Sequence, residues 1–299
     1  METKKFKYFS IILFLFTLLS VSAQESKQEI VVPLSKPGAN GTLKISLVSG
    51  SIKIEGYSGK EVLITATSLG NKDFYNIDRE RYVIPREYYR LKDIYENRSD
   101  IDEKDNVEGL KKISSNAYEI QVEQKDNNVE ISSSHFPVTT DLEIKLPHNF
   151  SLNLKTVTTG DINVKNVKGD HEITNYNGDV VMTGISGSAV ISAVNGKIEV
   201  TFDEISPNKP MSFANMNKKI DITIPSNTRA NLKMNTRMGE IYTDFDVDIV
   251  KTDPEVKRNN DLNYYRVEVN KYLTAKINGG GPELNFKNFN GNIIIRKKK

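Results

Sequence analysis

A nine-residue spacing between glycines is the sequence feature that most limits how this chain can fold. Five glycines follow one another at this interval: Gly160, Gly169, Gly178, Gly187 and Gly196. A fixed interval of this kind indicates an internal structural repeat, and repeats bury their apolar surface by stacking on their neighbours. The fold class therefore depends on what one nine-residue unit can form.

Each unit has the residue pattern of a short β-strand followed by a corner. The second, fourth and seventh positions after the glycine are mostly apolar, and we predict that they face inward. They are occupied by Ile162, Val164, Val167, Ile173, Tyr176, Val180, Met182 and Ile185. The third position, as in Asn163 and Glu172, is expected to point to water, because a strand alternates its side chains between two faces.

Turn residues indicate the size of one coil. The pairs Asn177-Gly178 and Asn195-Gly196 accept positive φ and lie 18 residues apart. Two nine-residue units per coil, with equivalent residues about 4.8 Å apart, is the geometry of a β-solenoid. The sequence therefore predicts an all-β, elongated, β-helix-like solenoid with coils of roughly 18 residues, in which Ile162 lies beside Val180.

The same pattern recurs near both ends of the chain. Glycine-led apolar alternation is found at 50–54, 59–64, 239–241 and 291–295. We therefore predict a single repeat domain over residues 24–299. Within it, the segments 118–122 and 129–131 alternate apolar and polar residues on either side of an Asp-Asn-Asn turn, which predicts a β-hairpin.

One region, 71–112, departs from the repeat. Of its 42 residues, 21 are Asp, Glu, Lys or Arg, and five are Tyr. Tyr88, Leu91 and Tyr95 have helical spacing, so we predict a charged insertion that is partly helical or disordered. Its two alternative roles are a solvated excursion, which is favoured, and a binding arm.

The first 23 residues have the pattern of a signal peptide. Three lysines precede an uncharged stretch, 8–23, that ends in Val-Ser-Ala, which predicts cleavage before Gln24. The apolar core is shorter than the roughly 20 residues that span a bilayer, so an uncleaved anchor is the less favoured alternative. The chain has no cysteine, which excludes a lipid anchor, disulfides and thiolate metal sites. We expect a periplasmic or secreted protein with no stable membrane anchor after cleavage.

Charge argues against a nucleic-acid partner. The whole chain has 41 basic and 39 acidic residues. Removal of residues 1–23 removes three Lys and one Glu, which leaves 38 of each. A formally neutral mature chain lacks the retained basic surface that binding to phosphates needs.

These motifs together resemble the bacterial family of adhesin-like β-strand-repeat envelope proteins, a domain of unknown function related to the head GIN domain of auto-transporter adhesins. The motifs that carry the resemblance are 158–162, 177–180, 195–198, 279–282 and 290–293. The resemblance covers most of the mature chain and implies a solenoid-like β architecture and an envelope location. It implies no catalytic residue, and the insertion at 71–112 lies outside it.

The histidines do not have the spacing of a metal site. His135, His148 and His171 lie in different units and form neither an HxH nor an HExxH motif. His171 fills the second, inward position of its unit. A buried histidine bonded to a neighbour is the favoured interpretation of this position, and a catalytic base is the alternative.

Three aspartates directly follow repeat glycines. Asp161, Asp170 and Asp179 could hold Ca²⁺ or act as an acid and a base on a sugar, because Asp161 and Asp179 should lie one coil apart. Lys197 takes the next equivalent position, and alternating charge favours a structural ladder. Asparagines at 166, 177 and 195 can likewise stack as amide ladders or cap turns.

Two other features have ordinary explanations. The glycines at 279–281 are followed by Pro282 and lack the Lys-Ser or Lys-Thr pair of a phosphate loop, so we predict a tight turn. The basic end, 296–299, could contact an anionic surface, but a solvated end that protects an edge strand is favoured.

No catalytic, cofactor-binding or metal-binding residue is therefore expected. We predict a non-enzymatic envelope protein with an adhesin-like binding or scaffold role through a stacked β-repeat surface. Its partner would be an envelope glycan or another envelope protein. The alternatives are a polysaccharide lyase or hydrolase on a β-helix, and a self-assembling structural element.

Overall fold

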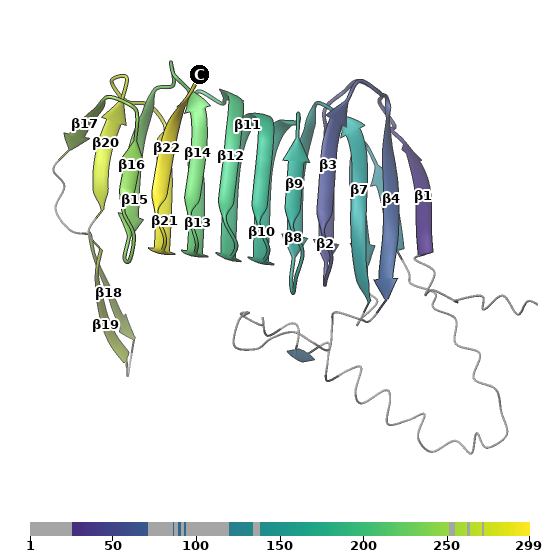
Figure 1. The fold of residues 1–299 in the computed structure, drawn as a ribbon, viewed down its shortest axis with the longest axis horizontal. Helices are drawn as coiled ribbons and strands as arrows, with labels where there is room; N and C mark the ends of the chain where they lie inside the picture. Colours follow the sequence, from purple (N-terminus) through teal and green to yellow (C-terminus); the bar gives the residue numbers. More distant parts are fainter. Residues whose placement is uncertain are drawn as a thin grey trace, which may run out of the picture.

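The described part of the chain is built from β-strands (Figure 1). The structure, a computed structural model, describes residues 26–70, 120–133, 138–250, 255–261, 264–270 and 272–299, with the isolated positions Arg86, Tyr89, Arg90 and Asp93. The signal peptide predicted at 1–23 lies outside these residues, as does nearly all of the insertion predicted at 71–112. None of the described residues belongs to a helix with the length and apolarity needed to cross a bilayer. The all-β prediction is confirmed.

The first of two hydrogen-bonded ladders follows the long axis of the molecule (Figure 1). In spatial order it contains β1 (Ser26–Pro33), β4 (Glu61–Gly70), β7 (Thr139–Pro147), β3 (Ile52–Tyr57), β9 (Ile162–Lys165), β11 (Val180–Asn195), β12 (Ile198–Ile205), β14 (Ile220–Pro225), β22 (Ile293–Lys298) and β16 (Ile241–Thr243). Strands from β7 to β16 pair in parallel, whereas β1 and β4 are antiparallel additions.

The second ladder has the same plan. In spatial order it contains β5 (Ile120–Lys125), β6 (Asn128–Ser133), β2 (Gly41–Leu47), β8 (Phe150–Thr156), β10 (Lys168–Asn177), β11, β13 (Met211–Asn217), β21 (Glu283–Asn290), β15 (Ala230–Thr236), β20 (Leu273–Ile277) and β17 (Val247–Val250). Its central strands are parallel, and antiparallel strands end it on both sides.

Strand β11 joins the two ladders into one 20-stranded sheet. Its first half pairs with β9 and β12, and its second half pairs with β10 and β13. A separate two-stranded hairpin, β18 (Glu255–Asp261) and β19 (Tyr264–Asn270), completes the described strands. The hairpin predicted around the Asp-Asn-Asn turn is also confirmed, because β5 and β6 are antiparallel and Asp126 and Asn127 have positive φ.

Apolar residues 18 positions apart in the repeat lie beside one another, as predicted. Ile162 pairs with Val180, and Val180 pairs with Ile198. Val164 is buried, whereas its neighbour Asn163 is half-buried. The same row continues at both ends in the order Leu142, Ile52, Ile162, Val180, Ile198, Ile220, Ile293 and Ile241. A continuous apolar row of this kind removes every member from water except at its ends.

The inner faces of the two ladders share one hydrophobic core. Phe202 of the first ladder contacts Phe213 of the second edge-on, with ring centroids 6.4 Å apart. Phe213 in turn stacks on Phe286 of the next coil at 5.2 Å. These rings are fully buried and fill the space between the faces, so they are a main source of packing in a chain without disulfides.

One inward position was wrongly predicted. Val167 and Ile185 are buried at corners, but Tyr176, at the same position of its unit, is half-buried on the outer face. The reason is that the nine-residue units alternate between two kinds: one turns at its seventh position, and the strand of the other continues through it. Strand β10 continues past this point, so Asn175 and Asn177 take the inward positions instead.

The order of the coils differs from the order of the sequence at both ends. The coil formed by β2 and β3 lies between those of β6–β7 and β8–β9. The last coil, β21–β22, lies between those of β13–β14 and β15–β16. The strand pairs β2–β3 and β21–β22 are therefore inserted between other strand pairs of the sheet, whereas β1 lies at an edge of the first ladder.

Candidate functional site

The stacked aspartates form a backbone-capping ladder. The Asp161 carboxylate accepts a hydrogen bond from the backbone N–H of Asp179 at 2.8 Å. The Asp179 carboxylate accepts one from the N–H of Lys197 at 2.9 Å. Each side chain therefore satisfies a corner N–H group of the next coil, which supports the structural interpretation of these aspartates. Among the described residues no group of three or more His, Asp or Glu could hold a metal ion.

Asp170 lies at a different corner. Its carboxylate accepts hydrogen bonds from the Lys209 ammonium at 2.7 and 2.9 Å, and from the Ser188 hydroxyl at 2.6 Å. The Lys209 bond first, and then the Ser188 bond, hold the pKa of Asp170 below its ordinary value. A carboxylate bound in this way is ionised and occupied, so it is poorly suited to donate a proton to a sugar.

His171 is buried in the apolar interior. It pairs with Leu152 on one side and with Ala189 on the other, and its side chain is 2% exposed. Neither ring nitrogen makes a hydrogen bond of good geometry. Burial lowers the pKa of His171 to about 4. Interactions of the ring with the backbone of Ser186, the charge of Asp170 and the backbone of Val167 raise the pKa and so oppose part of this shift. The predicted burial of His171 is confirmed.

The other two histidines do not join this site. His148 is exposed, and its Nδ1 lies 2.8 Å from the carbonyl oxygen of Asn166. His135 lies outside the described residues. The described histidines are therefore separated from each other, as their sequence positions suggested.

Amide ladders line one edge of the coils, as predicted. The Asn195 amide donates to the Asn177 side-chain oxygen at 2.8 Å, and Asn217 donates to Asn195 at 2.7 Å. Asn166 has the positive φ of a corner residue. The turn predicted at the glycine run is also present, because Asn278, Gly279 and Gly280 all have positive φ between β20 and β21. These polar groups are used to hold the backbone in place.

The basic end of the chain has a role that the sequence did not suggest. Residues 296–298 end β22, which pairs with β14 along its whole length and with β16 only at 293–295. Arg296 donates two hydrogen bonds to the Asp221 carboxylate, at 2.8 and 3.2 Å, and Lys219 donates a third at 2.9 Å. Lys298 lies 2.6 Å from Asp203. Ion pairs within the fold therefore engage Arg296 and Lys298, and protection of an edge by the basic end stays a prediction.

Replacing Asp221 with Asn should lower the free energy of unfolding by about 2 kcal/mol, the usual value of hydrogen bonds to a charged group. Burial alone would raise the pKa of Asp221, but the bonds from Arg296 and Lys219 outweigh it and hold this pKa below its ordinary value. Urea denaturation at pH 7 measures the change. Asp203→Asn is the matched control, because this carboxylate is half exposed and should change stability by less than about 0.5 kcal/mol.

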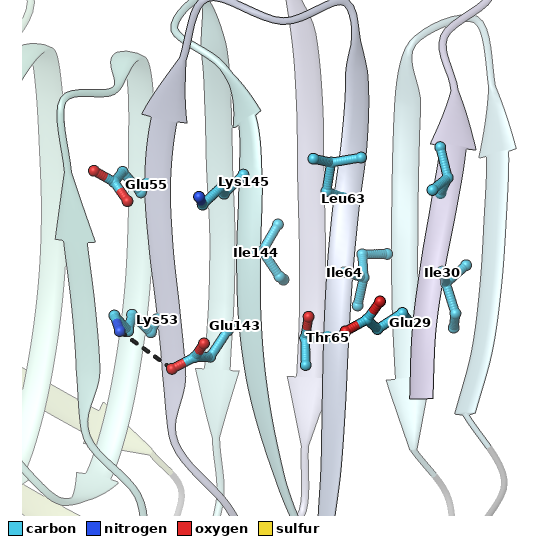
Figure 2. Close-up of a pocket in the computed structure, with 11 residues that line it drawn as sticks. Glu29, Ile30, Lys53, Glu55, Leu63, Ile64, Thr65, Glu143, Ile144 and Lys145 are labelled. Carbon is cyan, nitrogen blue, oxygen red and sulfur yellow. Dashed lines mark hydrogen bonds and ion pairs between the residues drawn. The ribbon is translucent and has the colours of Figure 1, made fainter. Parts of the chain in front are cut away.

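Two shallow grooves mark the outer faces. The first, of about 390 Å³, lies over β1, β4, β7 and β3 and is shown in Figure 2. The side chains that line it include Glu29, Lys53, Glu55, Leu63, Glu143 and Lys145. Lys53 pairs with Glu143 at 3.1 Å. Opposite charges therefore alternate here and neutralise one another.

The second groove, of about 410 Å³, lies on the outer face of β13, β21 and β15. The outward residues that line it are Ala214, Met216, Asn235, Arg237, Lys287 and Phe289. Its lining carries two cations and no carboxylate. The Arg237 guanidinium lies 5.6 Å from the centre of the Phe289 ring. This groove was not predicted from the sequence, because its residues come from strands that are adjacent only after the last coil is inserted.

Comparison with known proteins gives no family. No protein-family model matches the sequence. No curated protein matches it either. The chain is similar to a solved structure from Clostridium sporogenes described as a "putative cell adhesion protein", with 12% identity over 92% of this chain and 100% of that chain and a TM-score of 0.47. It is also similar to a "putative adhesin" from Bacteroides fragilis, with 11% identity over 93% and 98% of the two chains and a TM-score of 0.33. Both likenesses are too distant to assign a function.

Proposed function

We propose that this chain is an exported, non-enzymatic envelope protein that binds glycan through the outer faces of a β-solenoid. The solenoid assignment is supported by parallel pairing at an 18-residue offset, as between Gly169 and Gly187 and between Val180 and Ile198. The export assignment is supported by the signal-peptide pattern of residues 1–23.

The main support for a binding role is that the repeat aspartates are hydrogen-bonded within the fold, whereas the polar side chains of the outer faces are directed to solvent. Asp161, Asp170 and Asp179 each accept a hydrogen bond from another residue of the fold. The outer faces, in contrast, carry rows of Asn, Thr, Ser and charged side chains at the strand spacing. Flat polar rows are suited to contact an extended polymer, whereas hydrolysis requires two carboxylates that are free to face a single bond.

The exported mature chain, which should begin at Gln24, is expected to be retained on immobilised envelope polysaccharides while leaving their length unchanged. The Asp161→Asn/Asp179→Asn double variant should bind within about twofold of the parent, because neither carboxylate is assigned to the ligand. Binding is measured by glycan array and surface plasmon resonance, and chain length by size-exclusion chromatography. Shortened polysaccharide that disappears with the double variant would establish a lyase or hydrolase instead. Retention on no polysaccharide would refute the binding role.

A further inference from the structure

We infer that the groove on β13, β21 and β15 is a binding site for a polysaccharide that carries carboxylate groups. This inference rests on the proposed glycan-binding function and names its ligand class and its location. The groove is defined by Ala214, Met216, Asn235, Arg237, Lys287 and Phe289, and it is called the cationic groove below.

Charge distinguishes the cationic groove from the rest of the outer surface. Several described lysines on outer faces are paired with carboxylates, as Lys44 is with Glu130 at 2.8 Å. Arg237 and Lys287 are exposed and have no ion-pair partner within the described part of the chain. The three strands that form the groove contain one acidic residue, Glu283, and it lies at the opposite end of β21. The site therefore favours an anion.

Apolar side chains add a stacking surface beside these cations. Tyr176, Val194, Met216 and Phe289 occupy one row, because the residues on either side of them pair in register from β10 to β21. Phe289 is 42% exposed and Met216 is 47% exposed. Exposed apolar side chains in a row, next to cations and the Asn235 amide, suit a ligand that is apolar on its ring faces and charged at its edge. A sugar acid has this combination, with C–H groups on its faces and a carboxylate on its rim.

The spacing of the strands fits a polymer better than a single sugar. Neighbouring strands lie about 4.8 Å apart, a distance close to the advance of a polysaccharide chain per sugar ring. Lys287 on β21 pairs with Asn235 of β15, and Arg237 follows β15 two residues further along, so the two cations lie diagonally across neighbouring strands. Carboxylates of a polyuronate chain that crosses the two strands obliquely can therefore meet both cations, and the Arg237 guanidinium already lies against the Phe289 ring.

The test uses the mature chain and polygalacturonate, with its fully methyl-esterified form as the matched neutral polymer. Wild type should bind polygalacturonate at least tenfold more tightly than the ester, and the difference should shrink at high salt. Arg237→Gln/Lys287→Gln should weaken binding about tenfold, because two cation–carboxylate contacts are lost. Phe289→Ala should weaken binding to both polymers. Unchanged thermal unfolding of these variants shows that the fold is retained.

The matched control is Lys53→Gln/Lys145→Gln in the first groove, which removes the same charge from a site of similar size. It should bind as wild type does, because carboxylates already neutralise that groove. Equal weakening by both double variants would mean that net charge alone attracts the polymer, and it would overturn the inference. Binding of a neutral glycan but not of polygalacturonate, or preferential binding to anionic lipid vesicles, would also overturn it. Binding to no polysaccharide at all would overturn the proposed function itself.

Discussion

Replacing Gly178 with Ala should lower the free energy of unfolding by about 4 kcal/mol, the sum of a strained backbone and an overpacked corner. Gly178 has a φ of 145°, and a Cβ atom there would lie 2.2 Å from the carbonyl oxygen of Gly160 in the coil beside it. The obstacle is backbone, so no side-chain rotation can relieve it. Denaturation in urea, followed by far-ultraviolet circular dichroism, measures the loss.

Gly38→Ala separates the two causes of this loss. Gly38 also has a positive φ, of 87°, but a Cβ atom there would meet nothing within 4 Å. It should therefore cost only the backbone strain, about 1 kcal/mol. Equal losses at Gly38 and Gly178 would show that φ alone explains the glycine at position 178. The close approach of successive coils would then not be the reason for the nine-residue spacing.

The interior of this fold could be predicted from the sequence because one rule decides it. Strand side chains alternate between two faces, so every second residue after a repeat glycine had to face the same way. This rule correctly placed Ile162 and His171 in the interior, and the 18-residue repeat correctly placed Ile162 beside Val180. It failed at Tyr176, because the rule does not indicate whether a strand turns or continues at the seventh position.

The order of the coils could not be predicted in the same way. Ile220 pairs with Ile293, which is distant in the sequence, rather than with Ile241, which belongs to the next coil along the chain. All three residues have the same apolar character, so the sequence pattern is equally compatible with either neighbour. Non-local pairing of this kind depends on the packing of the whole stack, such as the contact of Phe213 with Phe286.

The cationic groove was missed for the same reason. Arg237 and Lys287 are 50 positions apart in the sequence and have no shared motif. They become neighbours because β21 lies against β15. The sequence does contain one usable signal, since β13, β15 and β21 together hold a single acidic residue in a chain with nearly equal numbers of acidic and basic residues. A search for local charge imbalance, strand by strand, would have found it.

Acidification from pH 7 to pH 4 should cost the wild-type protein about 3 kcal/mol of stability through His171 alone, at 1.36 kcal/mol per pKa unit. The pKa of His171 is about 4 in the folded protein and 6.5 in the unfolded chain. Between these values the unfolded state binds a proton that the folded state does not, so stability falls as the pH falls. Well above pH 6.5 the histidine is neutral in both states, and its contribution to the pH dependence vanishes.

Variants isolate this contribution from that of the carboxylates. His171→Leu should lose about 3 kcal/mol less than wild type over the same pH range, because Leu does not titrate and fits the row between Leu152 and Ala189. His171→Gln is a second non-titrating variant, should Leu fail to fold. His148→Gln, at an exposed histidine, should keep the wild-type profile.

Asp170 and Asp221, whose pKa values are lowered, lose their stabilising effect only as the pH falls below 3.8, which is outside this range. Urea denaturation at several pH values measures all four proteins, and a wild-type profile that coincides with that of His171→Leu would show that His171 is not held neutral in the core.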